Sequence, residues 1–203
     1  FSGAGGLSLG LEKSGLFPKL ALDKDTSSLK TYAFNRPYLN SNQILNEDIK
    51  IIANEHNFFK VPLVVGGPPC QGFSNANKQK KENDDRNSLY KFYVQTVEKS
   101  NPDIFLLENV EGILKFINVI EQDFKNIGYT LKPYLLNTSD FGFAQNRKRV
   151  FLVGISNNHS KIFDELYDIF STNLDNNKIG KKFTLWDVIS DLPKINAKTI
   201  SNS

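Results

Sequence analysis

Short apolar runs alternate along the chain with segments in which apolar residues recur every three or four positions. The runs predict strands at 20–22, 63–65, 104–107, 129–136 and 150–155, and the periodic segments predict helices at 7–14, 26–35, 89–99 and 113–126. Strands that alternate with helices are typical of a parallel sheet. We therefore predict an α/β fold with a mostly parallel, doubly wound sheet and helices on both of its faces.

The end of the chain departs from this pattern. Residues between the strands at 129–136 and 150–155 are too few for a helical crossover, so we expect the last strand to pair antiparallel. Beyond Ser156 the pattern predicts a helix at 163–170, a polar linker at 173–182 and a short helix opened by a capping box from Thr184 to Asp187. We accordingly divide the chain into a main domain, residues 1–156, and a terminal portion, residues 157–203.

Composition and charge exclude few classes of function. A net charge of +3 permits a nucleic-acid partner but is equally compatible with ordinary solvation. One cysteine excludes an internal disulfide and suits a reducing cytosol. No stretch is long and apolar enough to span a bilayer. Because Phe1 stands in place of Met, in what the pattern predicts to be the end of a strand, we expect the chain to be part of a longer polypeptide.

A glycine-rich turn opens the chain, with Gly3, Gly5 and Gly6 between the expected strand end and the first helix. Such a turn lets a ligand approach the backbone and the helix N-terminus. The third glycine of the dinucleotide fingerprint is missing, and a merely tight turn explains the glycines equally well. Asp23 follows the next strand, where an acidic residue suits a ribose diol, and Asp48 is a similar case after the third strand region. Both are ordinary surface carboxylates unless the turn binds a ligand.

The most informative segment is Gly66-Gly67-Pro68-Pro69-Cys70-Gln71-Gly72-Phe73-Ser74. It follows a buried strand and therefore lies at the carboxyl edge of the sheet, where ligands bind in such folds. A lone cysteine is more often a small buried hydrophobe than a nucleophile. The rigid Pro-Pro approach and the polar residues beyond Cys70 argue against burial, so we favour a functional cysteine.

Two further segments carry charge to the ends of strands. Glu108 is expected to end an apolar strand at the same sheet edge, where partial desolvation should raise the pKa of its carboxyl group and let it hold a proton. A carboxylate at a helix N-terminus is the equally open alternative. Before the last strand come Arg147 and Arg149, whose spacing places them on one face of a strand. Paired guanidinium groups suit phosphate or a base edge, although a solvated cationic turn is more common.

Together these segments resemble the carbon-5 cytosine DNA methyltransferase family in order and spacing. The resemblance rests on the Gly-rich turn, the Pro-Cys segment around Cys70, Glu108-Asn109-Val110, and Gln145 with Arg147 and Arg149. It covers roughly residues 1–193. It implies the class I S-adenosylmethionine-dependent methyltransferase fold, with S-adenosyl-L-methionine as cofactor and double-stranded DNA as partner. The family usually has Glu where this chain has Asp23, and residues 84–90 resemble a further family segment with Asn87 in place of Gly.

The resemblance also implies a mechanism. The Cys70 thiolate adds to carbon 6 of a cytosine flipped out of the duplex, and Glu108 protonates or hydrogen-bonds ring nitrogen 3. Carbon 5 then takes the methyl group, and loss of its proton expels the thiol. Arg147 and Arg149 are expected to hold the base oxygen and phosphate of the flipped nucleotide. Substrate contacts are further expected from Gln71, Ser74, Asn109 and Gln145.

Cofactor contacts are expected from residues at the carboxyl edge, with Phe1 at the adenine or sulfonium, Asp23 at the ribose and Asp48 with Ile49 at the adenine. The full expected set is Phe1, Ser2, Gly3, Gly5, Gly6, Asp23, Lys24, Asp48, Ile49, Pro69 and Leu89. The polar segment 75–87 carries several cations and is expected to be a mobile loop that closes on DNA.

Two alternatives remain open. A tRNA cytosine methyltransferase shares the fold, although its relatives typically depart from the Gln-Gly-Phe-Ser sequence that follows Cys70 here. A non-catalytic nucleic-acid-binding module is the other, against which the intact Cys70 and Glu108 argue. The family's target-recognition region is expected beyond these residues. We therefore expect weak cofactor binding and little site-specific methylation from the chain alone, and restoration of both by a C-terminal portion, fused or separate. A bacterial, cytoplasmic restriction-modification role is implied by resemblance.

Overall fold

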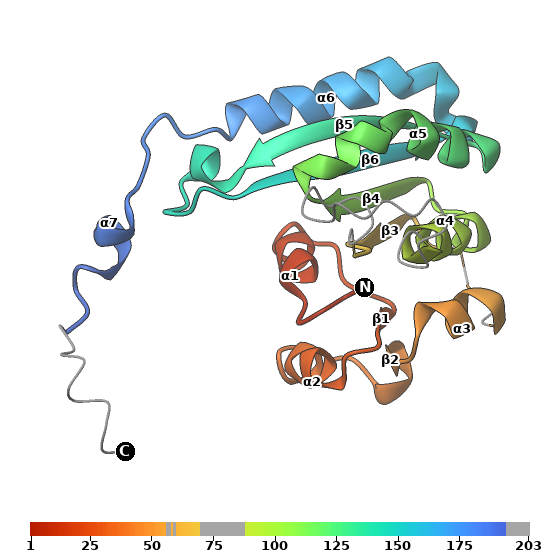
Figure 1. Ribbon diagram of the computed structural model, residues 1–203, viewed down its shortest axis with the longest axis horizontal. Coiled ribbons are helices and arrows are strands. Elements are labelled where there is room, and N and C mark those ends of the chain that lie inside the picture. The colour runs from red at the N-terminus through yellow and green to blue at the C-terminus, as the bar shows by residue number, and fades with distance from the viewer. Residues whose placement is uncertain (56–57, 59, 70–87, 194–203) are drawn as a thin grey trace, which may run out of the picture. The chain divides into compact units, whose positions relative to one another are not determined.

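The computed structural model describes residues 1–55, 58, 60–69 and 88–193 (Figure 1). The strands are β1 (Ala21–Asp23), β2 (Ile44–Asn46), β3 (Leu63–Gly66), β4 (Ile104–Asn109), β5 (Tyr129–Asn137) and β6 (Lys148–Ser156). The α-helices are α1 (Gly6–Lys13), α2 (Thr26–Phe34), α3 (Ile49–Glu55), α4 (Ser88–Ser100), α5 (Ile117–Asn126), α6 (Phe163–Asn176) and α7 (Leu185–Ile189). Short 3-10 helices are η1 (Ser41–Gln43), η3 (Glu111–Phe116), η4 (Thr138–Phe141) and η5 (Asn157–Ile162).

The described strands form two sheets. β1 and β2 pair in parallel as one sheet, and the other has the order β3-β4-β6-β5. Within the larger sheet β3 and β4 are parallel, whereas β4 and β6 are antiparallel. The predicted α/β class and the antiparallel final pairing are therefore confirmed. The register places Gly66 opposite Leu107, so the carboxyl ends of β3 and β4 lie at the same edge.

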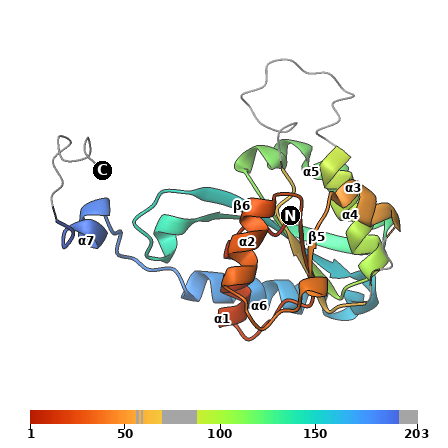
Figure 2. The ribbon, with the colours of Figure 1, turned by 90° about the horizontal axis from the view of Figure 1, so that it is seen from below.

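The core of the larger sheet lies under two helices. Figures 1 and 2 show α4 and α5 over the same face of this sheet, and their apolar residues share one buried cluster with β4 and β6. The rings of Phe105 and Phe124 stack with centroids 4.0 Å apart at its centre. Gly154 lies directly opposite Phe105 on β6, and a Cβ there would be 1.9 Å from the Phe105 ring. Glycine at this position is required by the close approach of the ring.

The helix expected at 26–35 is α2, and its N-cap is Asp25, whose carboxylate accepts a hydrogen bond from the Ser28 amide. Three other local expectations are corrected by the structure. β4 continues through Glu108 and Asn109, because pairing with β6 extends it beyond the apolar run. The helix expected at 113–126 is a 3-10 segment followed by α5, and α6 runs on to Asn176 through part of the expected polar linker.

The capping box before α7 is confirmed, because the Thr184 side chain accepts from the Asp187 amide and the Asp187 carboxylate accepts from the Thr184 amide. The chain divides into two compact units, residues 1–135 with 149–163, and residues 136–148 with 164–203. The boundary expected at 156/157 falls inside the first unit. Among the described residues, no helix has both the length and the apolar character required to cross a membrane.

Candidate active site

The glycine-rich turn is fastened to the carboxyl end of β1. The nitrogen of Phe1 and the amide of Ser2 both donate to the carbonyl oxygen of Leu22, at 2.7 and 2.9 Å. The Gly3 amide donates to Oδ2 of Asp23 at 2.8 Å. Gly5 is the N-cap of α1 with φ +93°, a left-handed conformation that glycine adopts without strain. The turn therefore places the N-terminus of α1 beside the acidic residue that ends β1.

A buried arginine is hydrogen-bonded to the backbone of this turn. Arg36, which follows the C-cap residue of α2, has a side chain that is 2% exposed. It forms a bidentate pair with Glu12, with contacts of 2.6 and 3.1 Å. Its Nη2 also donates to the Gly5 carbonyl oxygen at 2.9 Å, and its guanidinium lies 4.0 Å from the centroid of the Tyr32 ring. A Cβ at Gly5 would lie 2.3 Å from Arg36 Nη1. The conformation of the turn and the position of Arg36 therefore depend on each other.

The expected cofactor residues gather at this edge in part. Asp23 is half-buried, and its Oδ1 accepts from the Asp25 amide while Oδ2 accepts from Gly3. Asp48 accepts from the Lys50 amide at the start of α3, and Ile49 behind it is buried. Lys24, Gly6 and Pro69 are exposed, whereas Leu89 is half-buried at the start of α4.

The clearest charged arrangement lies at the carboxyl end of β4. Glu108 is opposite Phe151 in the register, which makes Arg149 its diagonal neighbour on the same face of the sheet. Arg149 Nε lies 3.0 Å from Glu108 Oε1, and the two side chains are 24% and 29% exposed. A Cβ at Gly67 would lie 3.1 Å from Glu108 Oε2. The carboxylate is thus held between Arg149 and the backbone that leads towards Cys70.

Asn109 points to the opposite, buried face of β4. Its side-chain amide donates to the carbonyl oxygen of Pro68 at 3.0 Å, and its Oδ1 accepts from the Val110 amide at 2.8 Å. Only 5% of the residue is exposed. Asn109 therefore fixes the backbone two residues before Cys70, a contact that the sequence did not indicate when it placed Asn109 at the substrate.

Five further site residues were expected from the sequence. Cys70, Gln71 and Ser74, and the expected loop at 75–87, lie outside the described residues. Gln145 and Arg147 are exposed, and Arg147 directly precedes β6 rather than lying within it. Their expected roles stay predictions.

Sequence reasoning missed Arg36 and Gly67. The partners of Arg36 are 24 and 31 residues away in sequence, at Glu12 and Gly5, so no local pattern could indicate the pair. Gly67 follows a buried strand, and its lack of a side chain beside Glu108 could have been inferred only with the strand register known.

The chain has an α/β fold with parallel and antiparallel strand pairs, a glycine-rich turn before α1 and an acidic residue at the carboxyl end of β1. This is the class I S-adenosylmethionine-dependent methyltransferase fold. A similar solved structure is a crystal structure described as a prophage-encoded DNA modification methyltransferase (E. coli), with a TM-score of 0.72 and 31% identity over 96% of this chain and 54% of that one. The chain belongs to the C-5 cytosine-specific DNA methylase family, whose model matches residues 1–203.

Curated relatives agree with this assignment. The chain is 34% identical to the Type II methyltransferase M1.HphI of Haemophilus parahaemolyticus over 97% of its own length and 52% of the relative's. It is 33% identical to the Type II methyltransferase M.DdeI of Desulfomicrobium norvegicum, over 97% and 48% of the two lengths. The chain thus spans about half the length of these relatives.

Proposed function

We propose that the chain carries the catalytic residues of a DNA cytosine-5 methyltransferase that takes its methyl group from S-adenosyl-L-methionine. The observation that carries this proposal is the Glu108 carboxylate, which is held by Arg149 beside Gly67 in a family whose model matches the whole chain. A carboxyl group at this position can hold a pyrimidine ring nitrogen while a nucleophile on the neighbouring segment attacks the ring. Cys70 is the only sulfur nucleophile that the chain contains.

The residues at the carboxyl end of β1 fit S-adenosyl-L-methionine. Ser2 Oγ is buried and has no hydrogen-bond partner among the described residues, so a polar ligand group would satisfy it. A Cβ at Gly3 or Gly6 would meet nothing within 4 Å, which leaves room for a ligand against the backbone. The first turn of α1 has no acidic residue and no side-chain cap, so its amides suit a carboxylate. Asp23 has lone pairs left for a ribose hydroxyl. When bound, the cofactor supplies an electrophilic methyl group.

The remaining chemistry belongs to this chain's own residues. The Cys70 thiolate adds to carbon 6 of the flipped cytosine, and the negative charge that develops on the ring is taken up at nitrogen 3. Glu108 donates a proton or a hydrogen bond to that nitrogen, and Arg149 orients its carboxyl group. Carbon 5 of this adduct attacks the methyl group and then gives up its proton to a water molecule. The electron pair left at carbon 5 forms the double bond to carbon 6 as the bond between carbon 6 and sulfur breaks. This step returns the thiolate, and nitrogen 3 returns to Glu108 any proton that it received. Arg149 thereby acts through Glu108, which differs from the direct nucleotide contact expected from sequence.

Covalent trapping on 5-fluorocytosine DNA tests this proposal. In this DNA fluorine replaces the hydrogen that carbon 5 must lose, so the enzyme cannot be released and the covalent adduct persists. The full-length polypeptide with S-adenosyl-L-methionine should form a denaturation-resistant adduct, and Cys70→Ser should form none. Glu108→Gln should form it at least about 100-fold more slowly, because an amide cannot donate the carboxylic proton. Adduct formation by Cys70→Ser would contradict the assignment of the nucleophile.

The same assay separates the alternatives. A DNA methyltransferase should be trapped on the DNA and not on a tRNA that carries the same fluorinated base, whereas the reverse preference would favour a tRNA enzyme. Binding to DNA with no adduct from the wild-type protein would favour a non-catalytic module. Because the residues match about half of each relative, recognition of a particular DNA sequence belongs to the full-length protein in this proposal.

A further inference from the structure

The end of α2 contacts α1 at three positions on one face of that helix. These positions are Gly5, Ser8 and Glu12, whose spacing of three and four residues places them on the same side of α1. Tyr32 Oη donates to Ser8 Oγ at 3.1 Å. The guanidinium of Arg36 donates to both the Gly5 carbonyl oxygen and the Glu12 carboxylate. The first turn of α1, where cofactor contacts are expected, is therefore linked directly to α2.

The orientation of the Arg36 guanidinium is fixed by its own contacts. Nη2 carries two hydrogens, of which one is donated to the Gly5 carbonyl oxygen and the other to Glu12 Oε2. Nε donates to the second carboxylate oxygen of Glu12, so the pair is bidentate and the guanidinium plane is set. The ring of Tyr32 lies against the guanidinium, with 4.0 Å between its centroid and Cζ. The direction of the N–H that reaches Gly5 is therefore fixed as well.

This hydrogen bond orients the peptide group between Gly5 and Gly6. The Gly5 carbonyl oxygen also accepts from the Leu9 amide at 2.9 Å, at the start of α1. In a planar trans peptide group the C=O and the following N–H point in opposite directions. The Gly6 N–H consequently points out of the N-terminus of α1, where the first amides of a helix have no acceptor within the helix. A donor placed on the Gly5 oxygen thus fixes a donor on the other side of the same peptide group.

The two glycines make this external support necessary. Gly5 has φ +93°, and glycine populates positive and negative φ about equally, so neither residue restricts the peptide group by itself. A Cβ at Gly6 would meet nothing within 4 Å among the described residues. Glycine therefore leaves room for a ligand at the cost of local rigidity, and the buried arginine supplies that rigidity from the opposite side of the turn.

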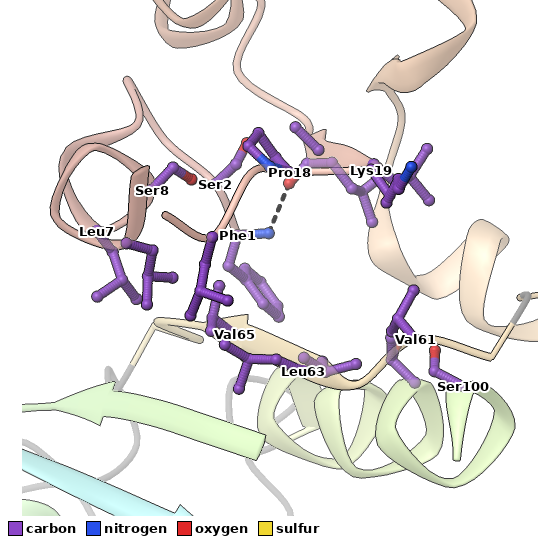
Figure 3. Close-up of a pocket in the computed structure, with 18 of the residues that line it drawn as sticks. Phe1, Ser2, Leu7, Ser8, Pro18, Lys19, Val61, Leu63, Val65 and Ser100 are labelled. Carbon is purple, nitrogen blue, oxygen red and sulfur yellow. Dashed lines mark hydrogen bonds between the residues drawn. The ribbon is translucent and has the colours of Figure 1, made fainter. Parts of the chain in front are cut away.

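A second polar group lies in the same turn. Ser2 Oγ is buried and has no hydrogen-bond partner among the described residues. The backbone on either side of it is held, because the Phe1 nitrogen donates to the Leu22 carbonyl oxygen and the Gly5 amide donates to the Ser2 carbonyl oxygen (Figure 3). Ser2 and Ser8 line the same pocket. A hydroxyl group and the amides of a helix N-terminus are donors that a carboxylate accepts.

We propose that Arg36 is a positioning residue for the cofactor, which acts through Gly5 to hold the Gly6 amide in the orientation that receives the carboxylate of the amino-acid part. This proposal rests on the cofactor proposed above, and it assigns to Arg36 an effect on one part of that ligand. The adenosine part is expected at Asp23 and Asp48, whereas the guanidinium is bonded to the glycine-rich turn. Loss of Arg36 should therefore weaken ligands that carry the carboxylate and spare those that lack it.

Calorimetry on the full-length protein tests this with two ligands. S-adenosylhomocysteine carries the amino-acid carboxylate, and 5′-methylthioadenosine shares its adenosine and sulfur but lacks the amino acid. Arg36→Met should raise the Kd for S-adenosylhomocysteine by about 10-fold or more and the Kd for 5′-methylthioadenosine by less than about 3-fold.

A double variant separates positioning from stability. Arg36→Met with Glu12→Met removes the carboxylate that the single variant strands, but it still lacks the donor to Gly5. Its stability should therefore recover in part, while its Kd for S-adenosylhomocysteine should remain raised by about 10-fold. The matched control is Lys178→Met, which removes an exposed ion pair with Asp175 in the second unit and should change neither Kd.

Equal changes in the two Kd values for Arg36→Met, including no change in either, would overturn the proposal. Recovery of the wild-type affinity for S-adenosylhomocysteine in the double variant would also overturn it, because Arg36 would then act on stability alone. If the single variant does not fold, the double variant decides by the same comparison of ligands. Failure of the wild-type protein to bind S-adenosylhomocysteine would instead contradict the proposed cofactor, and the role of Arg36 would fall with it.

Discussion

Arg36 offers the most direct test of how the glycine-rich turn is held. Arg36→Met keeps the length of the side chain and removes its charge and its donors. The variant leaves the Glu12 carboxylate, whose side chain is only 13% exposed, without the guanidinium, and leaves the Gly5 carbonyl oxygen without its donor. The loss is therefore that of breaking a buried pair rather than that of removing a surface charge.

The expected size follows from this geometry. Removal of one partner of a buried ion pair costs about 3–5 kcal/mol, because the other charge is left uncompensated. At about 2–4 °C per kcal/mol for a chain of this size, the Tm should fall by about 6–20 °C. The double variant Arg36→Met with Glu12→Met removes the stranded carboxylate and leaves chiefly the Gly5 carbonyl unpaired, which costs about 1–3 kcal/mol. The double variant should therefore be more stable than Arg36→Met alone.

Urea unfolding of the four members of this cycle measures the coupling. Lys91→Met is the matched control, since Lys91 and Asp123 form a pair with the same 2.6 Å contact while the lysine side chain is 55% exposed. Its removal should cost no more than about 1 kcal/mol. A loss for Arg36→Met no larger than that of the control, or a double variant that is less stable than the single one, would refute the reasoning.

Three further outcomes are expected. Gly154→Ala should destabilise the protein by about 1–3 kcal/mol or more in urea unfolding, because its Cβ would lie 1.9 Å from the Phe105 ring. Burial raises the pKa of Glu12, but hydrogen bonds from a tyrosine and an arginine outweigh it and bring the pKa below its ordinary value of 4.5. Glu12 therefore contributes fully to the free energy of unfolding above pH 4.5, and this contribution is lost as the pH falls through the lower pKa of the folded state. Glu12→Gln should accordingly reduce the loss of stability at acid pH, measured by urea unfolding over a pH series. Gly67→Ala should lower kcat by about 10-fold while sparing cofactor affinity in single-turnover assays, since its Cβ would lie 3.1 Å from Glu108 Oε2.

The hydrophobic pattern along the chain predicted most of the helices and strands. It failed where the end of an element depends on pairing with a segment that is distant in sequence. Apolar runs placed β1, β3, β4, β5 and β6, because buried strands are rich in apolar residues. The three-residue strand β2 was not among the expected strands. The apolar run predicted β4 at 104–107, with the polar Glu108 at its end. Pairing with Phe151 and Val150 on β6 carries the strand through both Glu108 and Asn109. Asp25 and Thr26 are both good caps by residue type, and only the backbone geometry selects Asp25.

In the candidate site, too, residue type and local position identified some residues, whereas contacts between distant segments were not predictable. Glu108 and Arg149 were found from residue type and position, but their pairing follows from the antiparallel register, which no single segment contains. Arg36 carried no local signal, because its contacts are tertiary. Cys70 remains a prediction of sequence and family, since it lies outside the described residues.

The dipeptide Glu108-Asn109 shows why the two residues must be adjacent. Successive residues of a strand face opposite sides, so Glu108 is presented to Arg149 and the Gly67 backbone while Asn109 reaches the Pro68 carbonyl from the buried face. One residue can present a carboxyl group to Arg149 and its neighbour can fix the segment before Cys70 only because the strand continues through both. A shift of register by one residue would exchange these roles and bury the carboxylate. The extension of β4 by β6 is therefore what makes this short polar sequence able to serve both purposes.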